Sequence, residues 1–212
     1  MKLISVREDR QGTHVILTFA DGSTLKTTGA VLTEAGVFAG DELSDEQLRS
    51  LRALAGRASA RERAVRIVAA SGVSERELRR RLEQRGERSS DAGEAVDWLR
   101  ELHLIDDRET ALQLTAGAVR KGYGRSRIRA ILREKGIPQE YWEEALSEVP
   151  QMDDAIDRFL HRCLDGKPLD DKLIRRTADA LLRRGHGWPE IRAGLKRYRE
   201  DLELADTMEE PE

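Results

Sequence analysis

The sequence predicts a mainly α protein: an elongated tandem array of three three-helix repeats preceded by a small N-terminal antiparallel β segment. The first observation is a change of pattern, because short β-branched runs fill roughly the first 40 residues and helical periodicity follows from Ser44. The second is a Leu-x-x-basic-Gly motif that recurs about every 50 residues. The third is composition: 36% of the 212 residues are charged and 39% are hydrophobic, which is typical of a charged helical protein and leaves no apolar run long enough to span a membrane.

The N-terminal segment is predicted to hold about three strands. Residues 2–6 and 14–19 are short β-branched runs with partial alternation, and residues 23–27 alternate as well. Asp21-Gly22 favours the positive φ angles of a tight hairpin between the last two runs. A sheet of this size needs another element to pack on.

Helix starts are predicted where a serine and a residue three positions later can satisfy backbone amides reciprocally. Such capping boxes begin at Ser44, Ser59 and Ser74, and Asp106 offers an aspartate cap. The neighbouring Asp107 is therefore interpreted as part of a helix start, not as a metal ligand, because no third ligand is near.

Helix ends are predicted at glycines that can adopt the left-handed cap, and Pro138 and Pro189 suit first-turn positions. The four stop glycines are Gly86, Gly122, Gly136 and Gly185. Starts and stops together predict about ten helices of roughly 10 to 16 residues.

An internal repeat sets the architecture. Residues 82–86, 132–136 and 181–185 share the Leu-x-x-basic-Gly motif, and their glycines are 50 and 49 residues apart. Upstream, Leu78 matches Ile128, but the third copy has Thr177 there. We therefore divide the chain into a β segment (1–43), a linking helix (44–56), three repeats (57–105, 106–149 and 150–199) and an acidic tail (200–212).

Charge is segregated along the chain. Residues 57–136 hold 19 basic and 13 acidic groups, and the remainder holds 18 basic and 27 acidic groups. Residues 120–136 alone have seven basic groups and one acid, whereas residues 200–212 have seven acids and no base. A basic middle suggests an acidic partner, and the acidic end is interpreted as a solvated, frayed tail.

Arg125, Arg129 and Arg133 are spaced by four, which places them on one face of a predicted helix. Like charges at this spacing repel, so an external anionic surface is one interpretation. The alternative is a solvated face that pairs with Glu134 and with acids of adjoining helices. Arg79 and Arg80 belong to a second cluster that neighbouring glutamates partly balance.

The basic residue before each repeat glycine has two interpretations. Arg85, Lys135 and Arg184 either face a partner or complement the carbonyl end of their own helix. The second, local role is favoured because it needs nothing outside the helix.

The sequence does not predict a base-stacking surface, a zinc site or a catalytic site. Trp98, Trp142 and Trp188 lie among apolar helix positions and are predicted in the core, so a base-stacking platform is not expected. Cys163 is the one cysteine, and His161 points away from it on a helix, so no zinc pair forms. No phosphate loop or nucleophile elbow occurs, and we expect neither an enzyme nor a cofactor.

The motifs at residues 104–107, 120–124, 128–137 and 183–185 resemble those of the RecX family of regulatory proteins, over about residues 57–200. The β-rich start is similar to the extra N-terminal segment of some members. The resemblance implies a cytoplasmic modulator of the RecA recombinase that lies along the groove of the RecA filament on single-stranded DNA. It also implies suppression of ATPase, strand-exchange and coprotease activities.

We therefore expect a monomeric, cytoplasmic, non-enzymatic negative regulator of RecA with no secretory leader and no membrane segment. The alternatives are a stand-alone DNA-binding protein that competes for strands, with weak and salt-dependent affinity, and a scaffold for another helical assembly. The predicted partner-binding residues are Arg125, Arg129 and Arg133 as main anchors, with Arg120, Lys121, Arg79 and Arg80 as auxiliaries.

Overall fold

The computed structural model describes the backbone of residues 1–208 and the side chains of residues 1–203. The chain divides into two compact units, Met1–Asp106 and Asp107–Glu212. Residues 209–212, the end of the predicted acidic tail, lie outside the described residues.

A three-stranded antiparallel sheet opens the N-terminal unit, as predicted. It consists of β1 (Leu3–Glu8), β2 (Val15–Phe19) and β3 (Thr24–Thr27) in the order β1-β2-β3. Gly22 turns the chain between β2 and β3 with a φ of 82°, because only glycine adopts this conformation without steric cost.

A short helix that the sequence analysis missed lies within the predicted β segment. It is α1 (Gly29–Ala35), and the Thr28 side chain accepts a hydrogen bond from the backbone N–H of Val31. Val31 shares one apolar core with Leu17 of the sheet and with Leu51 of the next helix. This packing supplies the support that three strands alone lack.

The long helix α2 (Asp45–Ala70) serves two cores. The capping box at Ser44 is confirmed, since the Gln47 N–H donates to the Ser44 hydroxyl over 3.2 Å and the Gln47 side chain accepts from the Ser44 N–H over 2.9 Å. The predicted start at Ser59 is wrong because α2 continues unbroken through this position. The Ser59 hydroxyl instead donates to Glu87 over 2.9 Å, beside the first three-helix bundle.

That bundle combines the C-terminal half of α2 with α3 (Glu75–Gln84) and α4 (Ser89–Glu101). The predicted cap at Ser74 is confirmed by a 3.1 Å hydrogen bond from the Glu77 N–H to the Ser74 hydroxyl. Leu78, Leu82 and Leu99 are fully buried in its core.

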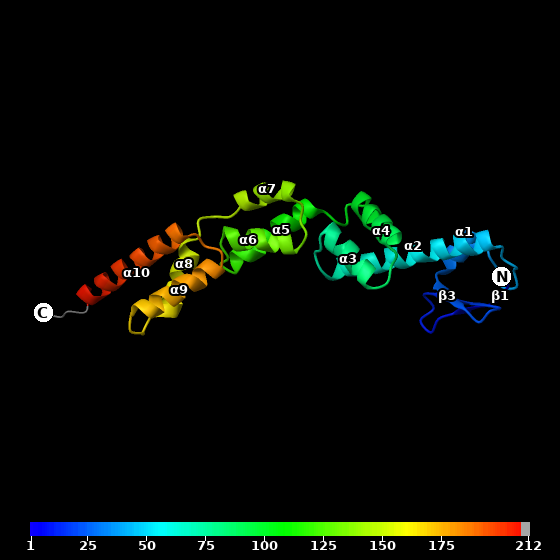
Figure 1. Cartoon of the computed structure of the whole chain (residues 1–212), viewed down its shortest axis with the longest axis horizontal. Coiled ribbons are helices and arrows are strands. Elements are labelled where there is room, and N and C mark those ends of the chain that lie inside the picture. The colour runs from blue at the N-terminus through cyan, green and yellow to red at the C-terminus, as the bar shows by residue number, and fades with distance from the viewer. Residues whose placement is uncertain (209–212) are drawn as a thin grey trace. The chain divides into compact units, whose positions relative to one another are not determined.

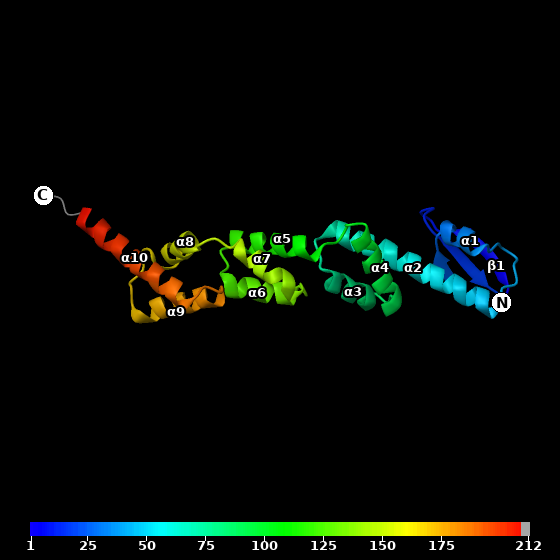
Figure 2. The same ribbon diagram turned by 90° about the horizontal axis from the view of Figure 1, so that it is seen from above.

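The second unit holds two further three-helix bundles, visible in Figures 1 and 2. One is formed by α5 (Asp107–Arg120), α6 (Arg125–Glu134) and α7 (Trp142–Ser147), with the short 3-10 helix η1 (Gln139–Tyr141) before α7. The other is formed by α8 (Asp153–Leu164), α9 (Asp171–Arg183) and α10 (Trp188–Met208). The helix α10 therefore extends into the segment predicted as a frayed tail.

The repeated Leu-x-x-basic-Gly motif is a helix-ending device. Gly86, Gly136 and Gly185 have φ values of 90°, 74° and 88°. In each copy the N–H of the residue after the glycine donates to the carbonyl of the motif leucine. The N–H of the glycine itself donates to the carbonyl of the residue that follows this leucine. The leucines are fully buried, so each copy joins a Schellman cap to a core anchor.

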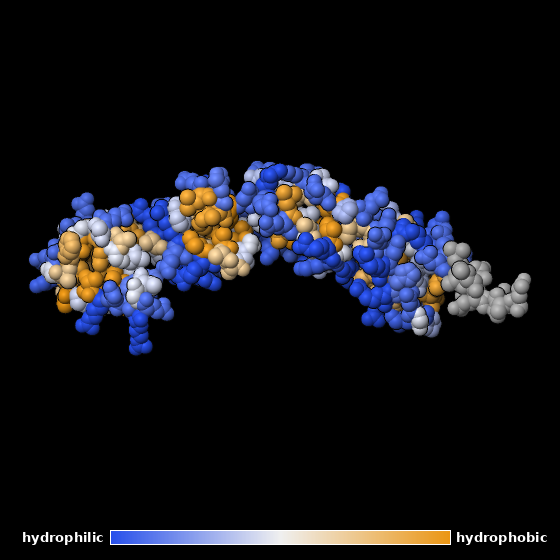
Figure 3. All heavy atoms as spheres, turned by 180° about the vertical axis from the view of Figure 1, so that it is seen from behind, coloured by the Kyte–Doolittle hydropathy of each residue, from blue (hydrophilic) through white to orange (hydrophobic). Residues whose placement is uncertain are grey.

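The surface of the described residues is largely hydrophilic, with apolar patches between charged side chains on the face drawn in Figure 3. Trp98 and Trp142 are half-buried, but the predicted burial of Trp188 is wrong, because this side chain is 47% exposed. Trp188 opens α10 ahead of Ile191, the first buried residue of that helix. Within residues 1–208, no helix combines the length and the apolar character that crossing a bilayer requires.

Candidate anionic-partner interface

The three arginines predicted to share one helix face lie on the outer face of α6, and we name them the arginine stripe: Arg125, Arg129 and Arg133. Gly124 caps this helix, and Ile128 and Leu132 anchor it in the core of its bundle. Arg125, Arg129 and Arg133 occupy the opposite, exposed face. The amphipathic pattern of α6 thus presents three guanidinium groups at successive turns.

Each arginine of the stripe makes one contact with a residue in α7 or just after it. The Arg125 guanidinium donates to the carbonyl of Val149 over 3.4 Å, and Arg129 lies 4.0 Å from the Glu143 carboxylate. The Arg133 guanidinium lies 5.9 Å from the centre of the Trp142 ring. These are long or weak contacts of exposed groups, so most of the donors of the stripe remain directed to solvent.

The expected partner of the stripe, Glu134, pairs with another residue. Its carboxylate lies 3.0 Å from the guanidinium of Arg127, on a different side of α6. Of the acidic partners expected for the stripe, only Glu143 of the adjoining helix lies near it among the described residues, at 4.0 Å from Arg129.

Arg120 and Lys121 lie at the C-terminal end of α5 and border a hollow against α8, which we name the junction hollow. Its volume is about 190 Å³. Five cationic side chains line it and no acidic residue does. The lining residues are Arg120, Lys121, Gly122, Ala155, Arg158, Phe159, Arg162 and Arg184.

Arg184 is held firmly at one wall of the junction hollow. Its guanidinium lies 5.0 Å from the ring centre of Tyr123 and 5.3 Å from that of Phe159, and it donates a hydrogen bond to the carbonyl of Lys121. The predicted role of this cation, complementing its own helix end, is therefore corrected: its guanidinium binds the carbonyl end of α5.

His186 lies beside Arg184 and is buried. Its Nε2 lies 3.1 Å from the carbonyl of Gly122, so this nitrogen carries the proton, whereas Nδ1 has no hydrogen-bond partner in the described part of the chain. Burial lowers the pKa of His186 below its ordinary value of 6.5, although the Gly122 carbonyl and Glu190 oppose the shift. The ring is thus neutral near pH 7.

Arg79 and Arg80 belong to the N-terminal unit, on α3. Arg80 forms two 2.9 Å hydrogen bonds with Glu77, and Arg79 lies against Gly93 of α4. Burial would raise the pKa of Glu77, but hydrogen bonds from Arg81 and Arg80 outweigh it and lower the pKa. Arg80 is therefore engaged locally.

Comparison with known proteins identifies the second bundle. Residues 106–146 match the family described as RecX, second three-helix domain. Over 97 residues the chain is 38% identical to the regulatory protein RecX of Salmonella typhimurium and of Salmonella paratyphi A. The second bundle therefore matches a domain of the RecX family. The match with these relatives covers 41% of the chain and 58% of each relative, so it spans less than two thirds of their length.

Solved structures of RecX proteins share the fold of this chain. A crystal structure of regulatory protein RecX aligns with a TM-score of 0.66 at 18% identity and covers 91% of this chain and 98% of that one. RecX from Lactobacillus salivarius aligns with a TM-score of 0.60 at 16% identity and covers 67% and 96%. The helical repeat architecture predicted from the sequence is therefore confirmed.

Part of the basic surface of this chain was not predicted from the sequence. Arg158 and Arg162 are exposed on α8, and neither forms an ion pair within the described residues. Their spacing of four was a visible signal. It was overlooked because their approach to Arg120 depends on how two consecutive bundles pack.

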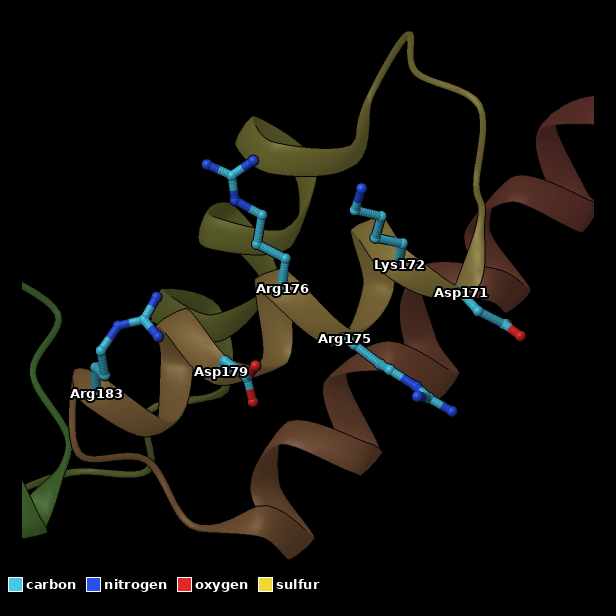
Figure 4. A pocket seen from close by; sticks show the side chains of 6 residues that line it. All are labelled: Asp171, Lys172, Arg175, Arg176, Asp179 and Arg183. Carbon is cyan, nitrogen blue, oxygen red and sulfur yellow. The ribbon is translucent and has the colours of Figure 1, made fainter.

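A second missed group lies along α9, around an open hollow of about 460 Å³. Figure 4 shows Lys172, Arg176 and Arg183 projecting from one side of the helix and Arg175 from another. Asp171 and Asp179 also line this hollow, so its charge is mixed, unlike that of the junction hollow. Among the described residues, no group of three or more His, Cys, Asp or Glu side chains could hold a metal ion.

Proposed function

We propose that this protein is a RecX family member and a negative regulator of the RecA recombinase. In this proposal it binds the RecA filament on single-stranded DNA and inhibits ATPase, strand-exchange and coprotease activities. The single observation that carries the proposal is the match of residues 106–146 to the second three-helix domain of RecX. This domain contains the arginine stripe, Arg120 and Lys121.

The exposed cations support a long, anionic partner surface. Arg125, Arg129 and Arg133 repeat along one helix face, as suits a repeating polymer, and arginine binds carboxylate and phosphate through paired donors. Arg120 and Lys121 add charge at the end of α5, and Arg79 and Arg80 are the proposed auxiliaries on α3. Several weak contacts on one chain add through effective concentration.

The proposal includes a monomeric protein that acts in the cytoplasm without catalysis of its own. Inhibition then follows from occupancy: a chain bound along the filament obstructs partner DNA or holds RecA in an inactive geometry. The alternative, competition for bare DNA, is favoured by one observation, the unpaired cations of the junction hollow.

A binding comparison tests the proposal. Purified protein is titrated against a fluorescent single-stranded oligonucleotide, bare or coated with RecA, across a salt series, and RecA ATPase is followed in parallel. Tighter binding to the coated strand together with inhibition supports regulation at the filament. Affinity for bare DNA that equals or exceeds affinity for the filament contradicts it.

A further inference from the structure

The junction hollow concentrates positive charge without compensation. Arg120, Lys121, Arg158 and Arg162 form no ion pair within the described residues, and no acidic residue lines the hollow. Asp157, the acid next to Arg158, is engaged by Arg197 over 2.8 Å. Converging like charges repel one another, so the folded state keeps a local cost that an anion would remove.

Part of the hollow is organised before any ligand arrives. Arg184 is fixed between the rings of Tyr123 and Phe159 and by the carbonyl of Lys121. The guanidinium of Arg162 lies 5.1 Å from the centre of the same Phe159 ring. Guanidinium groups held in this way lose little conformational entropy on binding, which favours affinity.

The size and composition of the hollow limit what it can bind. A volume of about 190 Å³ admits a compact group, and Gly122 and Ala155 add little side-chain bulk to the lining. Four arginines and a lysine match a tetrahedral anion with several oxygens, because each guanidinium can donate to two of them. A single side-chain carboxylate would leave most of these donors unused.

We propose that the junction hollow is a phosphate-binding site. The shared chemistry is that of phosphate oxygens, carried either by the phosphodiester backbone of single-stranded DNA or by a free polyphosphate. Arg158 supplies an exposed donor from α8, Arg162 and Arg184 supply donors held against the Phe159 ring, and Arg120 and Lys121 close the site from α5. The site is distinct from the stripe on α6, although Arg120 and Lys121 also belong to the proposed filament contact. Its test uses other residues and needs no RecA, so its failure is distinguishable from failure of the proposed function.

The test compares two double variants of the full chain. Arg158→Gln/Arg162→Gln removes two charges from the hollow, and the matched control Lys172→Gln/Arg176→Gln removes two charges at the same spacing from α9, on the face seen in Figure 4. Both variants change exposed side chains. Circular dichroism establishes that both remain folded.

The probes are a fluorescein-labelled oligothymidylate and sodium tripolyphosphate, measured by anisotropy and calorimetry between 50 and 200 mM salt, on the order of the range in which counterion release is measured. We expect the hollow variant to lose about tenfold in affinity for at least one probe while the control stays near wild type. If the oligonucleotide is the ligand, the salt slope falls by about 1.4, for two lost phosphate contacts.

The two probes distinguish the two sources of phosphate. Loss of oligonucleotide binding assigns the site to a nucleic-acid backbone, and loss confined to tripolyphosphate assigns it to a free polyphosphate. Unchanged affinity of the hollow variant for both probes overturns the proposal. Equal losses in the hollow variant and the control overturn it as well, because binding would then follow total charge.

Discussion

Gly185, at the end of α9, packs backbone to backbone against Gly124, at the start of α6. The Gly124 N–H donates to the carbonyl of Arg184 over 2.9 Å, and the Gly185 carbonyl accepts from the N–H of Ser126 over 3.2 Å. A Cβ atom on Gly124 would overlap the Gly185 carbonyl, and one on Gly185 would overlap the backbone of Arg127. Both positions therefore require glycine, and they join the second and third bundles through main-chain contacts.

This contact predicts a large effect of Gly185→Ala. The substitution adds the cost of a left-handed alanine, about 1–2 kcal/mol, to a steric clash of about 1–3 kcal/mol. Gly166→Ala is the control, since Gly166 has a φ of 69° in the same unit but open space around it. Chemical denaturation, read out by hydrogen exchange of residues 107–203, measures the free energy of unfolding of this unit. It should fall by roughly 1–2 kcal/mol in the control and by clearly more in Gly185→Ala. Equal losses would mean that the bundles do not touch here.

Part of this architecture could be predicted because it is encoded locally. Ser44, Ser74 and the motif glycines act within one helical turn, and their roles are confirmed. Ser59 fits the same capping pattern but lies inside α2, because the apolar face of that helix continues through Ala60 and Ala64 into the next core. A local signal was here overruled by packing.

The candidate site was less predictable because its geometry is not local. The stripe on α6 follows from helical spacing, but the junction hollow depends on α8 approaching the end of α5. The role of Arg184 was interpreted from its own helix, yet its guanidinium reaches Lys121 in the preceding bundle. Contacts between bundles of this kind leave no periodic trace in one sequence.

Arg184 is predicted to stabilise the C-terminal unit, whereas Arg85, at the same motif position of the first repeat, is not. Arg184→Ala removes two ring contacts and the hydrogen bond to Lys121, a loss of about 1–3 kcal/mol in free energy of unfolding. Arg85→Ala changes the same motif position, where the side chain is exposed, and should cost less than about 0.5 kcal/mol. Urea denaturation of the two variants checks this, and similar losses would show that the contacts of Arg184 contribute nothing.

His186 predicts a pH-dependent stability of the same unit. Burial lowers the pKa of His186 in the folded chain, so the unfolded chain takes up a proton first as the pH falls through 6.5. The contribution of neutral His186 to the free energy of unfolding is therefore fully present above this pH and decreases below it. Thermal unfolding between pH 7.5 and 5.5, on the order of one unit either side of the ordinary histidine pKa, should show a falling Tm for the wild type.

The control for this effect is a pair of histidine variants. His186→Gln should flatten the decline in Tm, because glutamine can still donate to the Gly122 carbonyl but does not titrate. His103→Asn changes an exposed residue with a φ of 53°, which asparagine tolerates, and should keep the wild-type decline. An unaltered decline in His186→Gln would assign the pH dependence to other groups.

The stripe on α6 gives the prediction that bears most directly on the proposed function. Arg125→Ala/Arg129→Ala/Arg133→Ala should reduce inhibition of RecA ATPase by about tenfold or more, equivalent to about 1.4 kcal/mol of binding energy. The variant should stay helical, because the contacts it loses are an exposed ion pair, a long hydrogen bond and one ring contact, together about 1–2 kcal/mol. Arg192→Ala/Lys196→Ala/Arg199→Ala removes three exposed charges from α10 and should inhibit like the wild type. If both triple variants lose inhibition equally, total charge decides and the stripe is no specific anchor; if neither does, the filament contact lies elsewhere on the chain.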